Sequence, residues 1–479
     1  MALRENTTLF LDDMAVAEQR GLTRLFAPAA KHPENPIIGR DNPWEAGAVY
    51  IFGSVLRDPE TNLLRMWYQA IDREAGTAPD HMTICYAESH DGVRWHKPLL
   101  PLVPYRHLKL TNIVLGNAVY PGNAYCSSVL LDAEARDPAE RYKMMVWYEQ
   151  WSDRLSPFNG AACFHSEDGL RWRAYPEAQP AIGINVLVEN GQVIRFESPN
   201  DANCVAPDKL DGEFVNWQVM RRQIPRPKRV YGRDLMAGDR LERVLAMQTS
   251  PDFVHWSEPR DIITPGPEDP DFIQFYSMGG FRYGNYWLGT LWMYYVHDQA
   301  MDVELALSRD GRHWSRPFAG QRLIPLGNSD AFDRGMMQTA TAPIIMGNQI
   351  YIYYGGEDHR HDEGGFCEIG LATLPLDRWA GLQTGRRGLL CTQPFVFSGA
   401  ALELNTYAVG GEVLTEVLDE RGEVIPGFGL DQNEPVVDDQ VAARLRWQGN
   451  GDLRGLQGRK IALRFSLSNA TIYAFTRCG

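Results

Sequence analysis

The chain repeats one seven-residue motif along most of its length. The form Ser-x-Asp-Gly-x-x-Trp occurs at Ser89–Trp95, Ser166–Trp172 and Ser308–Trp314. Ser250–Trp256 keeps the Ser, the Asp and the Trp, and Thr373–Trp379 is a weaker fifth copy. The tryptophans recur every 58 to 84 residues. Internal repetition of this kind indicates an architecture built from similar units.

Each copy follows a short apolar or alternating run that is typical of a β-strand. The Asp of the motif can accept hydrogen bonds from backbone N–H groups of a turn, and the Gly supplies a positive φ. The Trp is expected to fold back between neighbouring units as a large apolar side chain. The motif is therefore predicted to be structural and not catalytic.

Five units of three or four strands predict an all-β fold, a five-bladed β-propeller. We expect the propeller to occupy residues 1–382 and to carry the catalytic site. Gln383–Gly388 is a polar segment with two glycines, typical of a link. Short strands with regular turn signals follow it and predict a β-sandwich over residues 388–479.

Net charge, the N-terminal sequence and the cysteines limit the classes of function that the chain can have. The formal net charge is −14, which argues against nucleic acid or an anionic membrane surface as a partner. The N-terminus has no apolar segment of a secretory signal, so the sequence as given indicates a cytoplasmic protein and leaves room for a secreted precursor. The seven cysteines are scattered and predict neither zinc nor a disulfide framework. The oligomeric state stays open.

Five blades followed by a sandwich resemble glycoside hydrolase families 32 and 68, and the propeller alone resembles family 43. The likeness is carried by the repeated turns, by Ile369–Trp379 closing the last blade and by Phe397–Asn405 opening the sandwich. The nearest counterpart of the family 32 nucleophile segment is Arg40–Glu45. The resemblance implies an exo-acting glycoside hydrolase with a carbohydrate substrate, a furanoside of the fructoside or arabinoside kind or a related small glycan. It implies no cofactor, although an axial calcium is known in some family 43 members.

A propeller brings the openings of its inner strands to one axial funnel, and four of the five openings carry carboxylates. A glycosidase needs two, one acid and one nucleophile or base. We predict Glu45 as nucleophile or base and Asp201 as the residue that tunes the acid. Asp271 or Asp269 is the predicted acid, with Glu268 as a competitor. The alternative for each is a loop carboxylate that caps a turn.

Further side chains near these openings are predicted to bind the sugar. They are Trp44, Asp41, Asn203, Arg222, Gln274, Tyr276, Asp333, Arg334 and His359. No metal site is predicted, although the His359-x-His361 spacing could hold one.

Two other functions remain open at this point. A glycoside phosphorylase, as in the similar propellers of family 130, would need phosphate held by basic residues, for which Arg334, His359 and Arg360 are available. A non-catalytic carbohydrate-binding propeller would bind sugar without any acid. Fold alone does not separate these functions.

Overall fold

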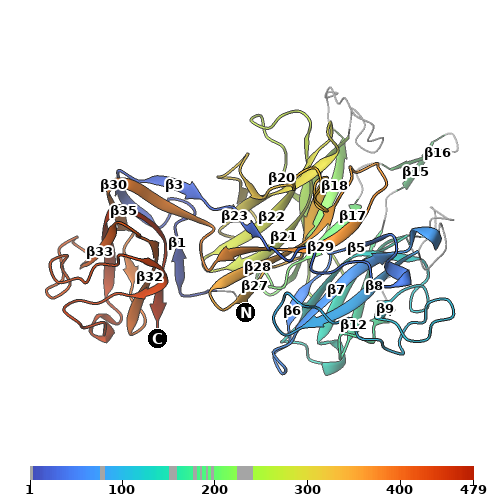
Figure 1. The fold of residues 1–479 in the computed structure, drawn as a ribbon, viewed down its shortest axis with the longest axis horizontal. Helices are drawn as coiled ribbons and strands as arrows, with labels where there is room; N and C mark the ends of the chain where they lie inside the picture. The colour runs from blue at the N-terminus through green and yellow to red at the C-terminus, as the bar shows by residue number, and fades with distance from the viewer. Residues whose placement is uncertain are drawn as a thin grey trace.

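A computed structural model describes residues 4–75, 81–149, 159–175, 181–183, 186–189, 192–195, 199–223 and 241–479. Within these ranges the chain is almost entirely β-structure, and five antiparallel sheets follow one another as the blades of a propeller (Figure 1). The predicted five-bladed propeller is confirmed. No helix in the described ranges is long and apolar enough to cross a membrane.

The blades share one order, in which the first strand lies at the axis. Blade one contains β5 (Ala48–Tyr50), β6 (Val55–Arg57), β7 (Leu64–Ile71), β8 (Met82–Ser89) and β9 (Ile113–Leu115). Blade two contains β10 (Asn123–Leu131), β11 (Tyr142–Glu149), β12 (Gly160–Ser166), β13 (Arg173–Ala174) and β14 (Ile182–Gly183). Blade three contains β17 (Pro199–Val205), β18 (Phe214–Gln223), β19 (Leu241–Ser250) and β20 (Arg260–Ile263).

Blade four contains β21 (Ile273–Tyr283), β22 (Tyr286–Tyr295), β23 (Ala300–Ser308), β24 (Trp314–Ser315) and β25 (Arg322–Ile324). Blade five contains β26 (Met336–Thr339), β27 (Ile344–Met346), β28 (Gln349–Glu357) and β29 (Cys367–Pro375). Its outermost strand is β4 (Ala30–Lys31), which pairs antiparallel with β29. The N-terminal segment thus completes the last blade and closes the ring.

The repeated motif forms the predicted turn. In the first copy the backbone N–H groups of Val93 and Arg94 donate to Asp91 Oδ1, and Gly92 has a φ of +77°. Phe253, which replaces that glycine in another copy, adopts the same conformation with a φ of +70°. Trp95 packs edge-on against Tyr353 of blade five, with ring centroids 5.6 Å apart. The predicted structural role is therefore confirmed.

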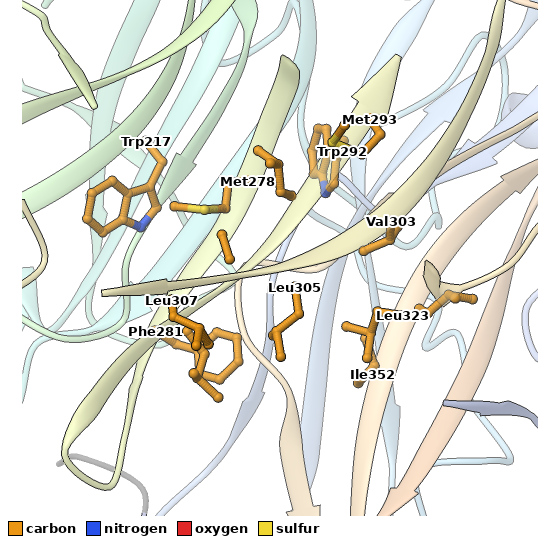
Figure 2. Packing of buried hydrophobic residues seen from close by; sticks show 14 of the residues in the cluster. Trp217, Met278, Phe281, Trp292, Met293, Val303, Leu305, Leu307, Leu323 and Ile352 are labelled. Atoms are coloured by element: carbon orange, nitrogen blue, oxygen red, sulfur yellow. The ribbon is translucent and has the colours of Figure 1, made fainter. Parts of the chain in front are cut away.

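Apolar side chains fill the space between the blades. Figure 2 shows part of the largest cluster, in which Trp217 of blade three and Met278, Trp292 and Leu305 of blade four are buried. Phe52, which follows β5, packs against three separate clusters that together include residues of all five blades. A side chain with contacts in clusters from all five blades lies near the centre of the ring.

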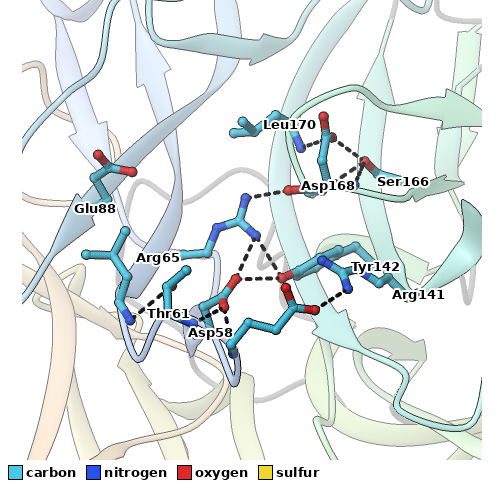
Figure 3. Close-up of polar contacts among 12 residues, drawn as sticks. Asp58, Thr61, Arg65, Glu88, Arg141, Tyr142, Ser166, Asp168 and Leu170 are labelled. Carbon is cyan, nitrogen blue, oxygen red and sulfur yellow. Dashed lines mark hydrogen bonds and ion pairs between the residues drawn. The ribbon is translucent and has the colours of Figure 1, made fainter. Parts of the chain in front are cut away.

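A buried arginine joins blades one and two on the side of the repeated turns (Figure 3). Arg65 donates to the hydroxyl group of Tyr142 at 2.7 Å and to the backbone carbonyl of Asp168 at 2.5 Å. It also donates to the hydroxyl group of Tyr86 at 2.9 Å. Asp58 lies 3.6 Å from the same guanidinium group. Only 7% of Arg65 is exposed, so these partners replace the water that the charge has lost.

Strands β15 (Val186–Glu189) and β16 (Gln192–Arg195) pair antiparallel with each other. The other strands form a nine-stranded antiparallel sheet beside the propeller (Figure 1). It contains β1 (Thr7–Leu9), β2 (Val16–Arg20) and β3 (Thr23–Phe26) from the N-terminus, and β30 (Ala380–Thr392), β31 (Phe395–Val396), β32 (Ala401–Tyr407), β33 (Glu412–Leu418), β34 (Asp439–Arg444) and β35 (Lys460–Cys478). Strand β30 runs through the segment that was expected to be a link. The sheet has a core of its own, and the sandwich within the predicted boundaries stays a prediction.

Candidate functional site

The inner strands place one side chain each at the entrance to the ring axis. These residues stand at the third or fourth position of their strands, and they are Tyr50 on β5, Tyr125 on β10, Asp201 on β17, Tyr276 on β21 and Gln338 on β26. We call the region of the ring axis next to these side chains the axial pit. Further side chains reach it from the second strands and from the loops that follow them.

Contacts run around the pit through blades one, two and three. Gln69 Oε1 of blade one accepts the backbone N–H of Cys126 in blade two at 3.1 Å. Tyr125 donates its hydroxyl to Glu149 Oε2 at 2.7 Å. Burial raises the pKa of Tyr125 well above its usual range, and the carboxylates of Glu149 and then Asp201 add to this, which shows that Asp201 is close.

The circuit continues through blades three, four and five. Burial, followed by the charge of Asp201, raises the pKa of Tyr276. The hydroxyl of Tyr276 lies 2.9 Å from His361 Nε2 of blade five. Arg243 lies over the ring of Tyr276, 5.0 Å from its centroid, and donates to Gln274 Oε1 at 2.9 Å. Asp201 therefore faces a pit that also holds tyrosine hydroxyls and a guanidinium group.

Glu357, at the end of β28, is the carboxylate with the most unusual setting. It is 4% exposed, and its Oε1 accepts the side-chain N–H of Gln338 at 2.7 Å. Its Oε2 lies 3.2 Å from His359 Nε2. Burial raises the pKa of Glu357 to about 7, although the Gln338 bond and the charge of Arg73 act in the opposite direction. A carboxyl group with this pKa can hold or release a proton at neutral pH.

A pocket of 510 Å³ adjoins Glu357 at the rim of blade five. It is lined by Gly327, Ser329, Arg334, Gly335, Asp358, His359, Arg360 and Glu363. Arg334 donates to the backbone carbonyl groups of Asp358 and Ser329, at 2.5 and 2.8 Å. His359 both lines this pocket and contacts Glu357, so the rim pocket and the pit share one boundary.

The structure places the predicted blade-one residues away from the pit. Glu45 is fully buried, and its carboxylate accepts Tyr68 at 2.5 Å, Lys97 at 2.8 Å and two backbone N–H groups at 3.0 Å. Trp44 is 3% exposed and donates to Asn112, so no ring face is open to a sugar. Asp41 is exposed and pairs with Lys97 at 2.9 Å. Glu45 is thus held as a structural anion.

The predicted acids of blade four also lie outside this circuit. Asp269 receives two bonds of 2.8 Å from Arg316, and Glu268 and Asp271 are exposed. In the neighbouring blades, Arg222 pairs with Asp261 at 2.7 Å. Asp333 is buried between Tyr354 at 2.8 Å and Lys31 at 2.6 Å. Asp269, Arg222 and Asp333 therefore each have an oppositely charged partner in the structure.

The structure brings together the other predicted residues. Asp201, Gln274 and Tyr276 belong to the axial circuit, Asn203 lies beneath it with 1% exposure, and Arg334 and His359 line the rim pocket. The catalytic and binding roles stay predictions. Sequence reasoning missed the second strands, which end in Glu149 and Glu357 after aromatic runs. The same repeat alignment that located the first strands could have found them.

Among the described residues, no group of three His, Cys, Asp or Glu side chains is arranged to hold a metal ion. The axial calcium suggested by the resemblance finds no such set of side chains in that part of the chain.

Comparisons with known proteins give likeness in shape only. No protein-family model matches the chain, and no curated sequence matches it. Among solved structures it resembles a glycosyl hydrolase from Bacteroides ovatus, at 16% identity and a TM-score of 0.46, over 78% of this chain and 97% of that one. It also resembles a β-1,2-mannobiose phosphorylase from Listeria innocua, at 13% identity and a TM-score of 0.44, over 74% and 98%. Similarity at this level carries no functional argument.

Proposed function

We propose that the protein is a glycoside hydrolase that acts in the axial pit, with Glu357 as proton donor and Asp201 as the second carboxylate. One observation carries the proposal: burial on β28 raises the pKa of Glu357 to about 7, and Asp201 supplies a second carboxylate from the inner strand of another blade. Acid-assisted cleavage of a glycosidic bond requires one carboxyl group that holds a proton near neutral pH and a second carboxylate.

The proposed step moves two protons: one passes from Glu357 to the leaving oxygen, and one passes from water to Asp201. Glu357 gives its proton to the glycosidic oxygen, and the bond from that oxygen to the anomeric carbon breaks. A water molecule adds to the anomeric carbon and loses a proton to Asp201, which acts as base. Asp201 Oδ1 accepts the backbone N–H of Ala202 at 3.0 Å. In the proposed step the other oxygen, Oδ2, binds the water molecule.

The shape of the pit favours cleavage at the end of a glycan. In the proposal, Phe52 near the centre of the ring ends the path of the substrate along the axis. Tyr50 stacks on Phe52 with centroids 5.7 Å apart and extends this apolar surface, which suits the carbon face of a sugar ring. An exo-acting enzyme for a small glycan is the corresponding proposal, and the furanoside specificity stays a prediction.

Assays on 4-nitrophenyl glycosides and on short oligosaccharides test the proposal. Wild type should release reducing sugar from at least one member of the set. Glu357→Gln and Asp201→Asn should each lower kcat by about 10²–10⁴-fold, whereas Glu420→Gln, on an exposed turn of the separate sheet, should have no effect. Sugar binding without any release, unaffected by these variants, would instead indicate a binding propeller.

A second candidate, a glycoside phosphorylase, is favoured by the rim pocket. Arg334, His359 and Arg360 line that pocket together, and guanidinium groups are strong phosphate ligands. In this reaction phosphate replaces water at the anomeric carbon and the product is a sugar phosphate. Turnover that requires inorganic phosphate and falls in Arg334→Ala and Arg360→Ala would select the phosphorylase; turnover in phosphate-free buffer would select the hydrolase.

A further inference from the structure

We propose that Asp358 and His359 are positioning residues for Glu357, in which Asp358 fixes the tautomer of His359 and His359 holds the acid proton of Glu357 in the resting enzyme. The inference rests on the proposed function, because it assigns a role to the proton that Glu357 donates. It concerns the chain of contacts from the rim pocket to the pit.

Hydrogen bonds decide which oxygen of Glu357 carries the proton. The amide group of Gln338 donates to Oε1 at 2.7 Å, so this oxygen is an acceptor. The other oxygen, Oε2, lies 3.2 Å from His359 Nε2. A proton on Glu357 is therefore placed on Oε2, where it faces the imidazole ring.

The far side of the ring fixes the tautomer. Asp358 Oδ1 lies 3.0 Å from His359 Nδ1 and also accepts the backbone N–H of Phe366 at 2.7 Å. Because this oxygen accepts the N–H of Phe366, it is also taken as the acceptor toward His359, which puts the proton between them on Nδ1. The neutral ring then has its lone pair on Nε2, and the bond to Glu357 needs the proton of the carboxyl group.

Electrostatics favour this distribution of protons. Burial lowers the pKa of His359 and raises that of Glu357, so the single proton between them belongs to the carboxyl group. Asp358 acts in the same sense on the two groups, since its negative charge raises both pKa values. Arg73 lowers both. Tyr50 and Cys367 also face Glu357, and burial raises their pKa values so that both are neutral.

The backbone is packed to keep this pair in place. A Cβ atom on Gly365 would lie 2.3 Å from Asp358 Oδ1 and 2.4 Å from His359 Nδ1. Both distances are far below contact range, so only glycine leaves room for the bond between the two side chains. The close approach is independent of the charges and supports a role for the pair.

A titration without substrate tests the inference. Glu357 is observed by NMR in protein labelled with ¹³C at glutamate carboxyl groups, and its signal is assigned by its loss in Glu357→Gln. His359→Ala should lower the pKa of Glu357 by about one unit or more, since the proton loses its acceptor and water enters. Asp358→Asn, which is nearly isosteric, should move the ¹⁵N signals of His359 away from the pure Nδ1–H tautomer.

The chain offers a matched control. His313 Nδ1 lies 2.6 Å from Asp310 Oδ2 in an exposed blade turn, and His313→Ala should leave the pKa of Glu357 unchanged. An unchanged or raised pKa in His359→Ala, or an Nε2–H tautomer in wild type, would overturn the inference. If the titration behaves as expected and no glycoside is cleaved, the positioning pair stands and the proposed function fails.

Discussion

The side-chain amide of Gln338 donates to Glu357 at 2.7 Å across two adjacent strands of blade five. This bond ties the inner strand at the axis to the carboxyl group at the end of the second strand. Gln338→Leu keeps the size of the side chain and removes the donor. It should therefore raise the pKa of Glu357 further, because the amide group stabilises the charged form.

In Gln338→Leu, the pH at which activity falls on the basic side of the pH–rate profile should rise by about half to one pH unit. The profile of kcat/KM measures this shift, because it reports the ionisation of the free enzyme. A limb that stays in place would mean that another group, and not Glu357, donates the proton.

Glu357 also makes folding stability depend on pH. Its pKa is about 7 in the folded chain against 4.5 for the free side chain, so the folded state binds the proton more tightly. Stability is then fully present below about pH 4.5 and is lost as pH rises to 7, by about 3 kcal/mol. Comparison of wild type with Glu357→Gln at pH 5 and pH 8 measures this loss. The substitution should raise the apparent unfolding temperature at pH 8 relative to wild type, and a lower value there would contradict the burial argument.

The ring could be predicted from the sequence because the turn motif is local. Ser, Asp, Gly and Trp at fixed spacing specify one turn each, and copies at similar intervals specify similar units. The role of β4 could not be predicted, since two residues carry no periodic signal and their place depends on the ring being closed. The same holds for β1 to β3, which join a sheet formed mainly by the last hundred residues.

The site was predicted less well, for a physical reason. An acid near a strand opening has the same appearance in sequence whether it faces the axis or a lysine. The buried Glu45 and Asp333 have partly exposed cationic partners, Lys97 and Lys31, that come from distant segments. Asp201 faces the pit because β17 lies at the axis in the correct register. Alignment of the repeats predicts where an acidic residue stands on its strand, and only the folded structure shows which charged groups lie beside it.

The pair of Lys31 and Asp333 should be important for ring closure. Asp333 is 1% exposed, and Lys31 is on the strand that completes blade five. Lys31→Met would leave a buried carboxylate without its cation, which costs about 3 kcal/mol. Thermal or urea unfolding measures the cost. Arg20→Met is a suitable control, because its partner Glu18 and the arginine itself are largely exposed, and a surface pair contributes less than about 1 kcal/mol. Equal effects of the two substitutions would refute a special role for Lys31.

Substitution of Gly92 by alanine tests how much the turn motif contributes to stability, with the same substitution at Gly212 as the comparison. Both Gly92 and Gly212 have positive φ, +77° and +86°. A Cβ atom added to Gly92 would lie 2.6 Å from the hydroxyl oxygen of Tyr353. A Cβ atom added to Gly212 would have no neighbour within 4 Å. Gly212→Ala should therefore cost only backbone strain, about 1 kcal/mol. Gly92→Ala should cost more, because it also separates the turn from blade five. If the two variants unfold at the same temperature, the contact with Tyr353 adds nothing to the turn.

Arg65 should not tolerate replacement even by lysine. Its guanidinium group binds Tyr142 and the carbonyl of Asp168 (Figure 3) and also Tyr86. A single ammonium group cannot reach all three. Arg65→Lys should leave buried acceptors unpaired and lower the free energy of unfolding by about 2–3 kcal/mol. Arg94→Lys, at a side chain that is 78% exposed, is the control and should change it by less than about 0.5 kcal/mol. Urea titrations of both variants measure the difference.

Because Arg65 lies on the side of the repeated turns, glycoside turnover by the folded variant should match wild type. A selective loss of turnover would show that the two blades hold the pit in shape through this residue.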